Sequence, residues 1–222
     1  MTLDKSPQNI QNMFNMIAKR YDFMNNVISL GTHNFVKYLS LKNLDIHPHD
    51  SVLDLCCGTG DLSRNIKKIQ PLACITGIDF SRQMLAIAQS KSCDIKYIEG
   101  DITKLPFEDN SFDFVTIGFG LRNISQPEKA VEEAYRVLRP GGKFLHLDFG
   151  RKNLISKIFD LIIPLISKLF YGNKNPYEYL INSKKIFPLP EELIKDFELK
   201  GFKFIKRKDY LFGVISSQIL KK

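Results

Sequence analysis

The chain has 222 residues, with 32 Lys and Arg against 24 Asp and Glu, and its formal net charge is +8. With 44% hydrophobic and 25% charged residues, the composition is typical of a folded globular domain and excludes a disordered or fibrous chain. The charge is unevenly placed: residues 1–150 hold 17 basic and 17 acidic side chains, whereas residues 151–222 hold 15 basic and 7 acidic ones. An acidic partner is therefore expected to meet the last third of the chain.

The four cysteines form no CxxC pair, and no short basic N-terminus followed by an apolar run is present. We therefore expect reduced thiols, no metal site and a cytoplasmic protein. The longest apolar tract, residues 158–170, is interrupted by Asp160, Pro164 and Lys168. It is too short and too polar to span a bilayer, so any membrane contact is expected to be peripheral, at the inner face.

Residues 1–50 are expected to form an N-terminal helical cap. Ile10, Met13, Phe14, Ile17 and Tyr21 recur at a spacing of three to four residues, which predicts a helix with one apolar face.

Residues 51–150 alternate short β-branched or aromatic runs with amphipathic segments of helical length, a pattern typical of a parallel sheet with crossover helices. Strands are expected near residues 51–55, 74–78, 95–99, 112–117 and 143–149. Helices are expected near residues 61–69, 82–90 and 127–138, and the last of these should stop at the Arg-Pro-Gly-Gly sequence that follows.

The C-terminal part follows a different pattern. Residues 151–190 contain an apolar helical segment over 154–170 and are expected to form a helical lid insertion. Residues 191–222 are expected to form a last helix and two strands, 202–210 and 212–219, which turn near Gly213 and pair antiparallel at the edge of the sheet. The sequence thus predicts a single α/β domain over residues 1–222, with residues 51–150 as its ligand-binding core.

A hydrophobic strand over residues 52–55 runs into a turn that contains Gly58, Thr59 and Gly60, and then into a helix. Such a turn at the carboxyl end of the first strand lets the backbone approach a ligand closely. Asp79 ends the next strand, where its carboxylate can accept both ribose hydroxyls of an adenosine. Ser63 replaces the third glycine of a dinucleotide fingerprint, and no Gly-Lys-Ser/Thr follows for a P-loop.

The adenosine cofactor that fits these departures is S-adenosylmethionine, which carries no phosphate. Asp54 is the acidic group near the turn that can lie close to its positive charge. Asp101 ends the third strand, and Asp101 and Ile102 are expected to flank the adenine. The alternative is that Asp79 and Asp101 only cap the turns that follow them. Capping explains a single acid at a strand end well, but it explains poorly why three successive strands each end near an acid. We therefore predict a Rossmann-like class I S-adenosylmethionine-dependent methyltransferase fold, mostly parallel with a C-terminal antiparallel hairpin.

The end of the fourth strand faces the transferred methyl in this architecture, and it reads Gly-Phe-Gly-Leu-Arg-Asn over residues 118–123. No Asn-Pro-Pro-Tyr type clamp for a nitrogen acceptor is present. Gly118 and Gly120 are expected to leave room for a flat ring, Phe119 to stack on it, and Arg122 with Asn123 to hydrogen-bond its oxygens.

Several blocks together resemble the quinone-biosynthesis C-methyltransferase family over nearly the whole chain: residues 13–18, 21–25, 29–33, 58–61, 119–123 and 177–180. The resemblance implies that Thr59, Asp79, Asp101, Ile102 and Gly118 contact S-adenosylmethionine, although members often carry serine where this chain has Gly118. It also implies C-methylation of a reduced polyprenyl quinone. Demethylmenaquinol is favoured as the substrate, and 2-methoxy-6-polyprenyl-1,4-benzoquinol is the alternative.

In a reduced quinone, the carbon beside a hydroxyl becomes nucleophilic when that hydroxyl loses its proton. Arg122 is the expected catalytic cation that stabilises the phenolate, and Asn123 is expected to orient it. The general base is left open between water, a carboxylate and the groups Tyr21, Asp22 and His33.

The expected site residues fall into two groups. The cofactor is expected to contact Asp54, Gly58, Thr59, Gly60, Asp79, Asp101, Ile102 and Gly118. The substrate is expected to contact Tyr21, His33, Phe119 and Tyr177.

The N-terminal and 154–170 helices are expected to hold the isoprenoid tail, unless they only cover the sheet.

The basic residues 206–208 raise a nucleic-acid methyltransferase as a distant alternative, but they lie in a predicted strand without interleaved aromatics, so no nucleic-acid partner is expected. A third alternative, a cofactor-binding module without activity, leaves Arg122 and Asn123 without a role. Basic residues of 151–222 are expected to hold the substrate entrance against an anionic membrane, at about 1 kcal/mol each. A homodimer is among the oligomeric states left open.

Overall fold

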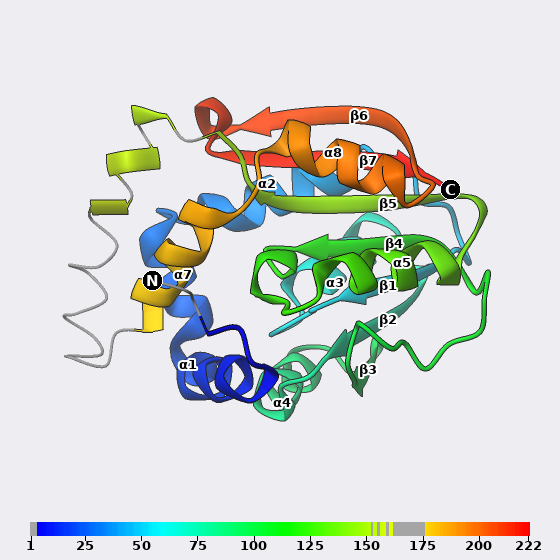
Figure 1. The fold of residues 1–222 in the computed structure, drawn as a ribbon. Helices are drawn as coiled ribbons and strands as arrows, with labels where there is room; N and C mark the ends of the chain where they lie inside the picture. The colour runs from blue at the N-terminus through cyan, green and yellow to red at the C-terminus, as the bar shows by residue number, and fades with distance from the viewer. Residues whose placement is uncertain (1–3, 152, 155, 159, 162–175) are drawn as a thin grey trace.

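The computed structural model describes residues 4–151, 153–154, 156–158, 160–161 and 176–222. Within these residues, seven strands form one sheet in the order β3-β2-β1-β4-β5-β7-β6 (Figure 1). The chain therefore starts at the centre of the sheet, moves to one edge, crosses back over β1 and finishes at the other edge.

The parallel part of the sheet consists of β1 (Ser51–Leu55), β2 (Cys74–Asp79), β3 (Lys96–Glu99), β4 (Phe112–Gly118) and β5 (Leu138–Phe149). Its central strands are apolar on both faces, and Val52, Leu53 and Leu55 are at most 1% exposed. Such runs form strands in this fold because helices cover both faces of a parallel sheet. The predicted parallel strands are confirmed.

The C-terminal strands are β6 (Lys203–Tyr210) and β7 (Ile215–Lys221), joined by the short helix η2 (Leu211–Gly213). They pair antiparallel as predicted, and β7 also pairs antiparallel with β5, so it lies inside the sheet and β6 forms the edge. Burial accounts for this order, because the first six residues of β7 are buried and most of the Lys-rich β6 is exposed. Lysines on an edge strand also discourage pairing with other chains.

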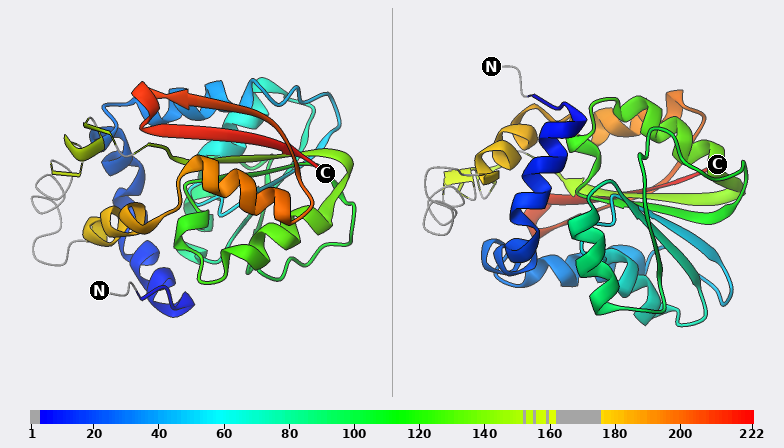
Figure 2. Two further views of the ribbon diagram at one scale, coloured as in Figure 1. Left: turned by 45° about the horizontal axis from the view of Figure 1, so that its top comes forward. Right: turned by 90° about the horizontal axis from the view of Figure 1, so that it is seen from below.

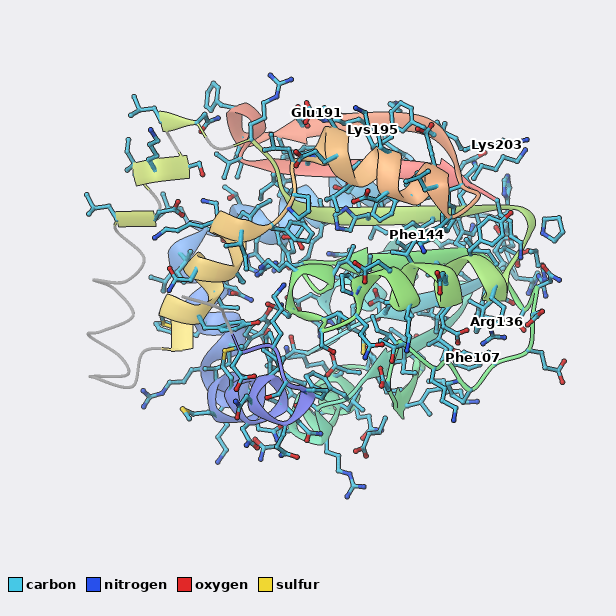
Figure 3. The ribbon with its side chains drawn as sticks, in the orientation of Figure 1. Phe107, Arg136, Phe144, Glu191, Lys195 and Lys203 are labelled. Atoms are coloured by element: carbon cyan, nitrogen blue, oxygen red, sulfur yellow. The ribbon has the colours of Figure 1, made fainter. Side chains whose placement is uncertain are left out.

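Helices cover the two faces of the sheet (Figure 2). On one face lie α5 (Pro127–Val137) and α8 (Pro190–Leu199), and on the other lie α2 (Thr32–Leu41), α3 (Asp61–Ile69) and α4 (Arg82–Lys91). Phe144 of β5 lies in the core beneath α5 and α8, where its ring stacks on Phe202 at 5.2 Å and meets the edge of Phe197 at 5.6 Å (Figure 3). The helix predicted over 127–138 ends at Val137, and Leu138 already begins β5.

Helices α1 (Pro7–Ile28) and α7 (Pro176–Ile186) lie beyond the carboxyl ends of the parallel strands (Figure 1). The predicted N-terminal helix is present, and its apolar face packs on Met84 of α4. Polar bonds fix α1 above the strand ends: Gln11 Nε2 donates to the carbonyl of Phe80 at 2.7 Å, and Ser81 Oγ donates to Asn15 Oδ1 at 2.6 Å. The first helix is thereby held over the turn that follows β2.

The predicted apolar helix over 154–170 lies largely outside the described residues. Its described part is helical, with Leu154, Ile158 and Leu161 exposed to 74%, 49% and 71%. Among the described helices, none is long and apolar enough to cross a bilayer.

Candidate active site

The turn between β1 and α3 is shaped by residues with left-handed backbone. Cys56, Gly58 and Gly60 have φ angles of 51°, 55° and 79°, and α3 begins directly afterwards at Asp61. A Cβ at Gly60 would overlap the Tyr97 hydroxyl and approach Ala88 Cβ to 3.1 Å, so only glycine fits there. The turn therefore packs tightly against α4 and β3.

Asp79, at the end of β2, holds this turn in place. Its Oδ2 accepts the Gly58 N–H at 2.9 Å, and its Oδ1 accepts the Ser81 N–H at 2.9 Å. Burial raises the pKa of Asp79 to about 6, although these backbone donors act in the opposite direction. Asp79 thus caps the following turn, as the capping alternative predicted, and also fixes the glycine turn.

Asp54 is a second buried carboxylate, with 1% of its surface exposed. It accepts hydrogen bonds from Ser63 Oγ at 2.5 Å and from Thr116 Oγ1 at 2.9 Å. Burial raises the pKa of Asp54 to about 6, and the two hydroxyl donors only partly offset this. Ser63, which departs from the dinucleotide pattern, is therefore the residue that stabilises this acid.

Three adjoining cavities follow the carboxyl edge of the sheet, and Cys56 lines all of them. The outer cavity, of about 310 Å³, is lined by Phe80, Asp101 and Ile102. The middle cavity, of about 50 Å³, is lined by Gly58 and Asp79 among others. The inner cavity, of about 170 Å³, lies between α1, α2, α7 and the ends of β1, β4 and β5. An elongated ligand can therefore extend along this row.

Asp101 and Ile102 differ in their surroundings. Asp101 is exposed, and its Oδ1 accepts both the N–H and the hydroxyl of Thr103 at 2.8 Å. Ile102 is only 3% exposed. One oxygen of Asp101 therefore caps the following turn, as the capping alternative predicted. Both residues line the outer cavity, and their contact with an adenine stays a prediction.

Arg122, in η1 (Leu121–Asn123), faces the inner cavity and is 6% exposed. Its Nη1 donates to Asp148 Oδ1 and to the Phe119 carbonyl, both at 2.8 Å, and its guanidinium lies over the Phe149 ring at 4.9 Å. Asp148 is fully buried. The predicted cation is therefore already paired within the protein.

Asn123 lines the middle and outer cavities instead, and its Nδ2 donates to the Phe119 carbonyl at 3.3 Å. Arg122 and Asn123 were predicted to act together on ring oxygens, but their side chains border different cavities. Adjacent residues on a 3-10 helix point in different directions, which explains the separation.

The glycines on either side of Phe119 have different roles. A Cβ at Gly118 would meet only Leu62 Cδ2 at 3.4 Å, so space remains there, as predicted. A Cβ at Gly120 would come within 2.5 Å of Cys56 Cβ, so this glycine permits close packing. Gly120 also lines the middle cavity, so room for a substrate ring beside it stays a prediction. Phe119 itself has a φ of 59°, meets the edge of the Phe149 ring at 5.8 Å and lines both the inner and the middle cavity.

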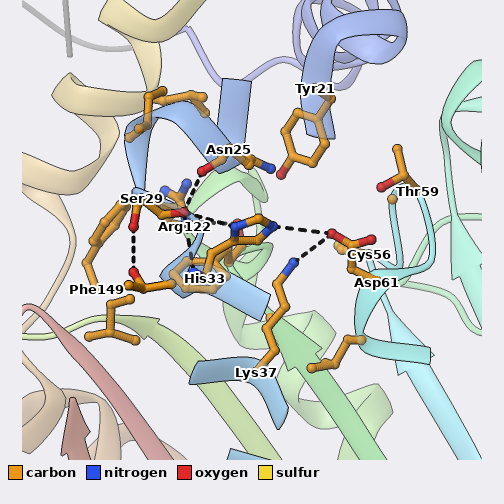
Figure 4. A pocket seen from close by; sticks show the side chains of 18 of the residues that line it. Tyr21, Asn25, Ser29, His33, Lys37, Cys56, Thr59, Asp61, Arg122 and Phe149 are labelled. Atoms are coloured by element: carbon orange, nitrogen blue, oxygen red, sulfur yellow. Dashed lines mark hydrogen bonds and ion pairs between the residues drawn. The ribbon is translucent and has the colours of Figure 1, made fainter. Parts of the chain in front are cut away.

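His33 and Lys37 occupy one face of α2 and reach the inner cavity together with Asp61 (Figure 4). Asp61 Oδ2 lies 3.7 Å from His33 Nε2 and 3.3 Å from Lys37 Nζ, while its Oδ1 accepts Arg64 Nη2 at 2.6 Å. Burial acts to raise the pKa of Asp61, but the positive charges of Lys37 and Arg64 act in the opposite direction, and that pKa is held well below its usual range.

Sequence reasoning placed His33 at the site but missed Lys37, Asp61 and Phe149. The spacing of four residues between His33 and Lys37 could have indicated Lys37, since such residues share a helix face. Asp61 directly follows the glycine turn, so its position was visible, but its cationic neighbours depend on how α2 packs against α3.

The remaining predicted site residues are two substrate residues, Tyr21 and Tyr177, and one cofactor residue, Thr59. Tyr21 lines the inner and middle cavities (Figure 4), and burial raises the pKa of its hydroxyl. Thr59 lines the inner cavity and its Oγ1 donates to Asp22 Oδ1 at 2.6 Å. Tyr177 belongs to α7, but its side chain lies outside what the structure describes.

The ubiE/COQ5 methyltransferase family matches the chain over residues 1–222. The chain belongs to this family. It is 37% identical to the demethylmenaquinone methyltransferases of Staphylococcus aureus strains JH9 and Newman, in alignments that cover 96% of this chain and 92% of each relative. It is an S-adenosylmethionine-dependent methyltransferase.

Solved structures share the fold. A Haloferax volcanii methyltransferase, determined in complex with the activator Trm112, has a TM-score of 0.74 at 18% identity and covers 96% of both chains. A Thermotoga maritima S-adenosylmethionine-dependent methyltransferase has a TM-score of 0.69 at 20% identity and covers 95% of this chain and 99% of its own. The predicted Rossmann-like methyltransferase fold is confirmed.

The residues along the row of cavities suit this cofactor. Asp54 and Asp79 are buried carboxylates, and neither forms an ion pair within the described residues. A ligand that carries a sulfonium and an ammonium group supplies the positive charge that these acids lack.

Proposed function

We propose that this methyltransferase transfers a methyl group to a ring carbon of demethylmenaquinol, a reduced polyprenyl naphthoquinone, and so forms menaquinol. The observation that carries the proposal is the composition of the inner cavity. Phe119 and Phe149 offer it an aromatic wall, and Arg122 and Lys37 offer positive charge at the carboxyl ends of β1 and β4. A flat apolar ring that develops negative charge on oxygen suits such a cavity.

S-adenosylmethionine, when bound, supplies an electrophilic methyl on a positively charged sulfur. In our proposal Asp101 and Ile102 hold its adenine in the outer cavity, and Asp79 accepts hydrogen bonds from its ribose. The glycine turn formed by Gly58, Thr59 and Gly60, together with Asp54 and Gly118, borders its amino-acid end. The order of the three cavities along the sheet supports this orientation.

Arg122 is proposed to stabilise the quinolate oxygen, with Tyr21, His33 and Phe119 as the surrounding substrate contacts. Its salt bridge to Asp148 fixes the guanidinium against the Phe149 ring, so that the cation is held in place before the substrate arrives. Asn123 is proposed to act on the cofactor side, since it borders the middle and outer cavities.

The direct test is methyl transfer from isotopically labelled S-adenosylmethionine to chemically reduced demethylmenaquinone, with the product identified by mass spectrometry. The benzoquinol of ubiquinone synthesis and a bulk RNA sample serve as competing acceptors. We expect label in menaquinol. Faster transfer to the benzoquinol would show that the benzoquinol, and not demethylmenaquinol, is the substrate. Transfer to RNA alone would refute quinol methylation.

We further propose that the protein contacts the membrane reversibly, and that the N-terminal helix and the described part of the 154–170 segment border the isoprenoid tail. Exposed apolar side chains support this, because Leu154, Leu161 and Phe212 are 71–86% exposed. Asn153 Nδ2 donates to the Phe212 carbonyl at 2.7 Å, so η2 adjoins the start of that helix. The exposed Arg151 and Lys157 add positive charge beside them.

Co-sedimentation with vesicles that contain anionic lipid tests this contact. Phe212→Asn should weaken binding, since asparagine tolerates the left-handed φ of 56° but removes the exposed ring. Leu199→Asn is the matched control, because Leu199 is 83% exposed at the end of α8. That end of α8 lies close to Lys203, which begins β6 at the opposite end of the sheet from η2 (Figure 3). Equal sedimentation of both variants and the wild type would refute the proposed surface.

A further inference from the structure

The two nitrogens of His33 have different surroundings in the inner cavity (Figure 4). Nδ1 lies 2.9 Å from Ser29 Oγ, and that hydroxyl donates its own hydrogen to the Asn25 carbonyl at 2.6 Å. Ser29 Oγ must therefore accept from the His33 ring, as it does from the His33 backbone N–H at 3.3 Å. Neutral His33 consequently carries its proton on Nδ1 and presents Nε2 as an acceptor.

Nε2 is a buried acceptor without a donor. His33 is 7% exposed, and Nε2 has no hydrogen-bond partner within the described residues. The Asp61 carboxylate lies 3.7 Å away, which is beyond hydrogen-bond range, and it is itself an acceptor. Two acceptors that face each other in a cavity call for a proton donor from a ligand, because buried polar groups are otherwise paired.

The other candidate bases in or near this cavity are engaged, and among them Asp160 pairs with Lys184 Nζ at 2.6 Å. Asp22 accepts from Thr59 and Lys91, and Asp54 accepts from Ser63 and Thr116. The Tyr21 hydroxyl stays protonated, because burial raises its pKa. His33 is therefore the group whose free lone pair borders the proposed quinol site.

We infer that His33 Nε2 is the general base that removes the proton from the substrate hydroxyl, and that Asp61 stabilises the imidazolium that forms. The inference rests on the proposed function, because a quinol supplies the O–H donor. As the O–H bond breaks, its electron pair stays on oxygen and spreads onto the neighbouring ring carbon, while the proton bonds to Nε2.

The proton balance follows from the chemistry of the ring. After methyl transfer, the ring carbon loses its hydrogen as a proton and the oxygen recovers a proton from His33. One proton is released in each turnover, which balances the positive charge that the cofactor sulfur loses. The positive charges of Lys37 and Arg122, which line the same cavity, favour the quinolate during this exchange.

A spectroscopic experiment tests the base without the cofactor. The probe is 4-methoxy-1-naphthol, which has one ionisable hydroxyl and does not cycle between quinol and quinone. On the wild-type protein at neutral pH we expect the absorbance of naphtholate. In His33→Gln, that absorbance should arise only at the pH at which free naphthol ionises. The variant keeps the other charged and titratable side chains that line the cavity, which include Tyr21, Lys37, Asp54, Asp61, Arg122, Asp160 and Lys184. Naphtholate in both proteins, or in neither, would overturn the inference.

Kinetics supply the second readout. His33→Gln should lower the kcat for demethylmenaquinol by about 10²- to 10⁴-fold, the usual contribution of a general base, with S-adenosylmethionine affinity unchanged by calorimetry. His47→Gln is the matched control, because its side chain is 67% exposed, and its activity should equal that of the wild type.

Ser29→Ala provides a variant that keeps the imidazole but removes the partner that sets its tautomer, and its kcat should fall about tenfold. Circular dichroism and thermal unfolding establish that each variant is folded. A folded His33→Gln with wild-type kcat would refute the role of His33 alone. A wild-type protein that does not methylate the quinol would refute the proposed function, while the naphthol spectra would still decide what His33 does.

Discussion

Asp54 and Asp61 lie seven residues apart on either side of the glycine turn, both are buried, and the protein treats them in opposite ways. Asp54 is surrounded by hydroxyl donors, and burial raises its pKa to about 6. Asp61 meets Lys37 and Arg64, and its pKa is held well below the usual range despite burial. Position along the chain therefore does not decide the state of a carboxylate, but the charge of its neighbours does.

The same contrast divides the whole site. On the proposed cofactor side, Asp54 and Asp79 form no ion pair with any residue that the structure describes, so the apoprotein holds them at a cost that a positively charged ligand would relieve. On the substrate side, Asp61 and Asp148 are paired with Lys37, Arg64 and Arg122. The first arrangement favours binding of a cation, and the second fixes cations where, in our proposal, negative charge develops on the substrate.

The largest effect is expected on the substrate side, from Arg122→Met. Removal of the guanidinium leaves the fully buried Asp148 without its cation, and breaking such a pair typically costs about 3–5 kcal/mol of folding stability. Urea unfolding at pH 7.5 measures this loss. Asp148→Asn combined with Arg122→Met should recover much of it, because the uncompensated charge is gone. A single variant as stable as the wild type would show that this acid is not dependent on its partner.

The cofactor side should respond with the opposite sign to Asp54→Asn. The folded-state pKa of Asp54 is raised from 3.8 to about 6, so Asp54 binds its proton more tightly in the folded protein than in the unfolded chain. Protonated Asp54 therefore favours the folded state, and this stabilisation is lost as the pH rises from about 4 through about 6. At pH 7.5 this cost amounts to about 3 kcal/mol. The variant apoprotein should therefore be more stable than the wild type at pH 7.5 by up to that amount, because the Ser63 and Thr116 hydroxyls can turn to accept from the amide.

Urea unfolding at pH 4.5, 6.0 and 7.5 checks the sign, and the stability gain should vanish at pH 4.5. Calorimetry supplies the other half of the comparison: wild-type affinity for S-adenosylmethionine should rise with pH between 5.0 and 7.5, and the rise should be smaller in Asp54→Asn. A variant that is less stable than the wild type at all three pH values would contradict the idea that this acid lacks a compensating charge.

Much of the cofactor side could be predicted from the sequence because its elements follow one another along the chain. Asp54, the glycine turn and Asp79 belong to successive strand ends, and parallel strands bring those ends to one edge. The pairs on the substrate side come from tertiary packing: Lys37 and Asp61 are 24 residues apart, and Arg122 and Asp148 are 26 apart. Local pattern placed Arg122 at the site but not the partner that fixes it. It also could not tell that Gly120 packs on Cys56, because that contact joins two separate turns.

A smaller effect is expected from Gly120→Ala, where the two sides of the site meet. The added Cβ would lie 2.5 Å from Cys56 Cβ, a contact that requires the glycine turn to shift. Overpacking of this kind costs about 1–3 kcal/mol, which thermal unfolding measures. If Cys56→Gly in the same chain restores part of the stability, the close approach is the cause. An unchanged melting temperature in Gly120→Ala would instead support the interpretation that this glycine leaves free space.

The smallest effect is expected from Gly118→Ser, two residues away. Its Cβ has ordinary contact distance to Leu62, so folding stability should change by no more than about 0.5 kcal/mol.

The new hydroxyl borders the middle and inner cavities and gives the cofactor side a donor and acceptor that the glycine lacks. One added hydrogen bond corresponds to about 0.5–1.5 kcal/mol, so S-adenosylmethionine should bind about two- to thirteenfold more tightly by calorimetry. Gly118→Ala is the matched control, since it adds the Cβ without the hydroxyl, and it should bind like the wild type. Equal affinity in the serine and alanine variants would place the cofactor away from this strand end.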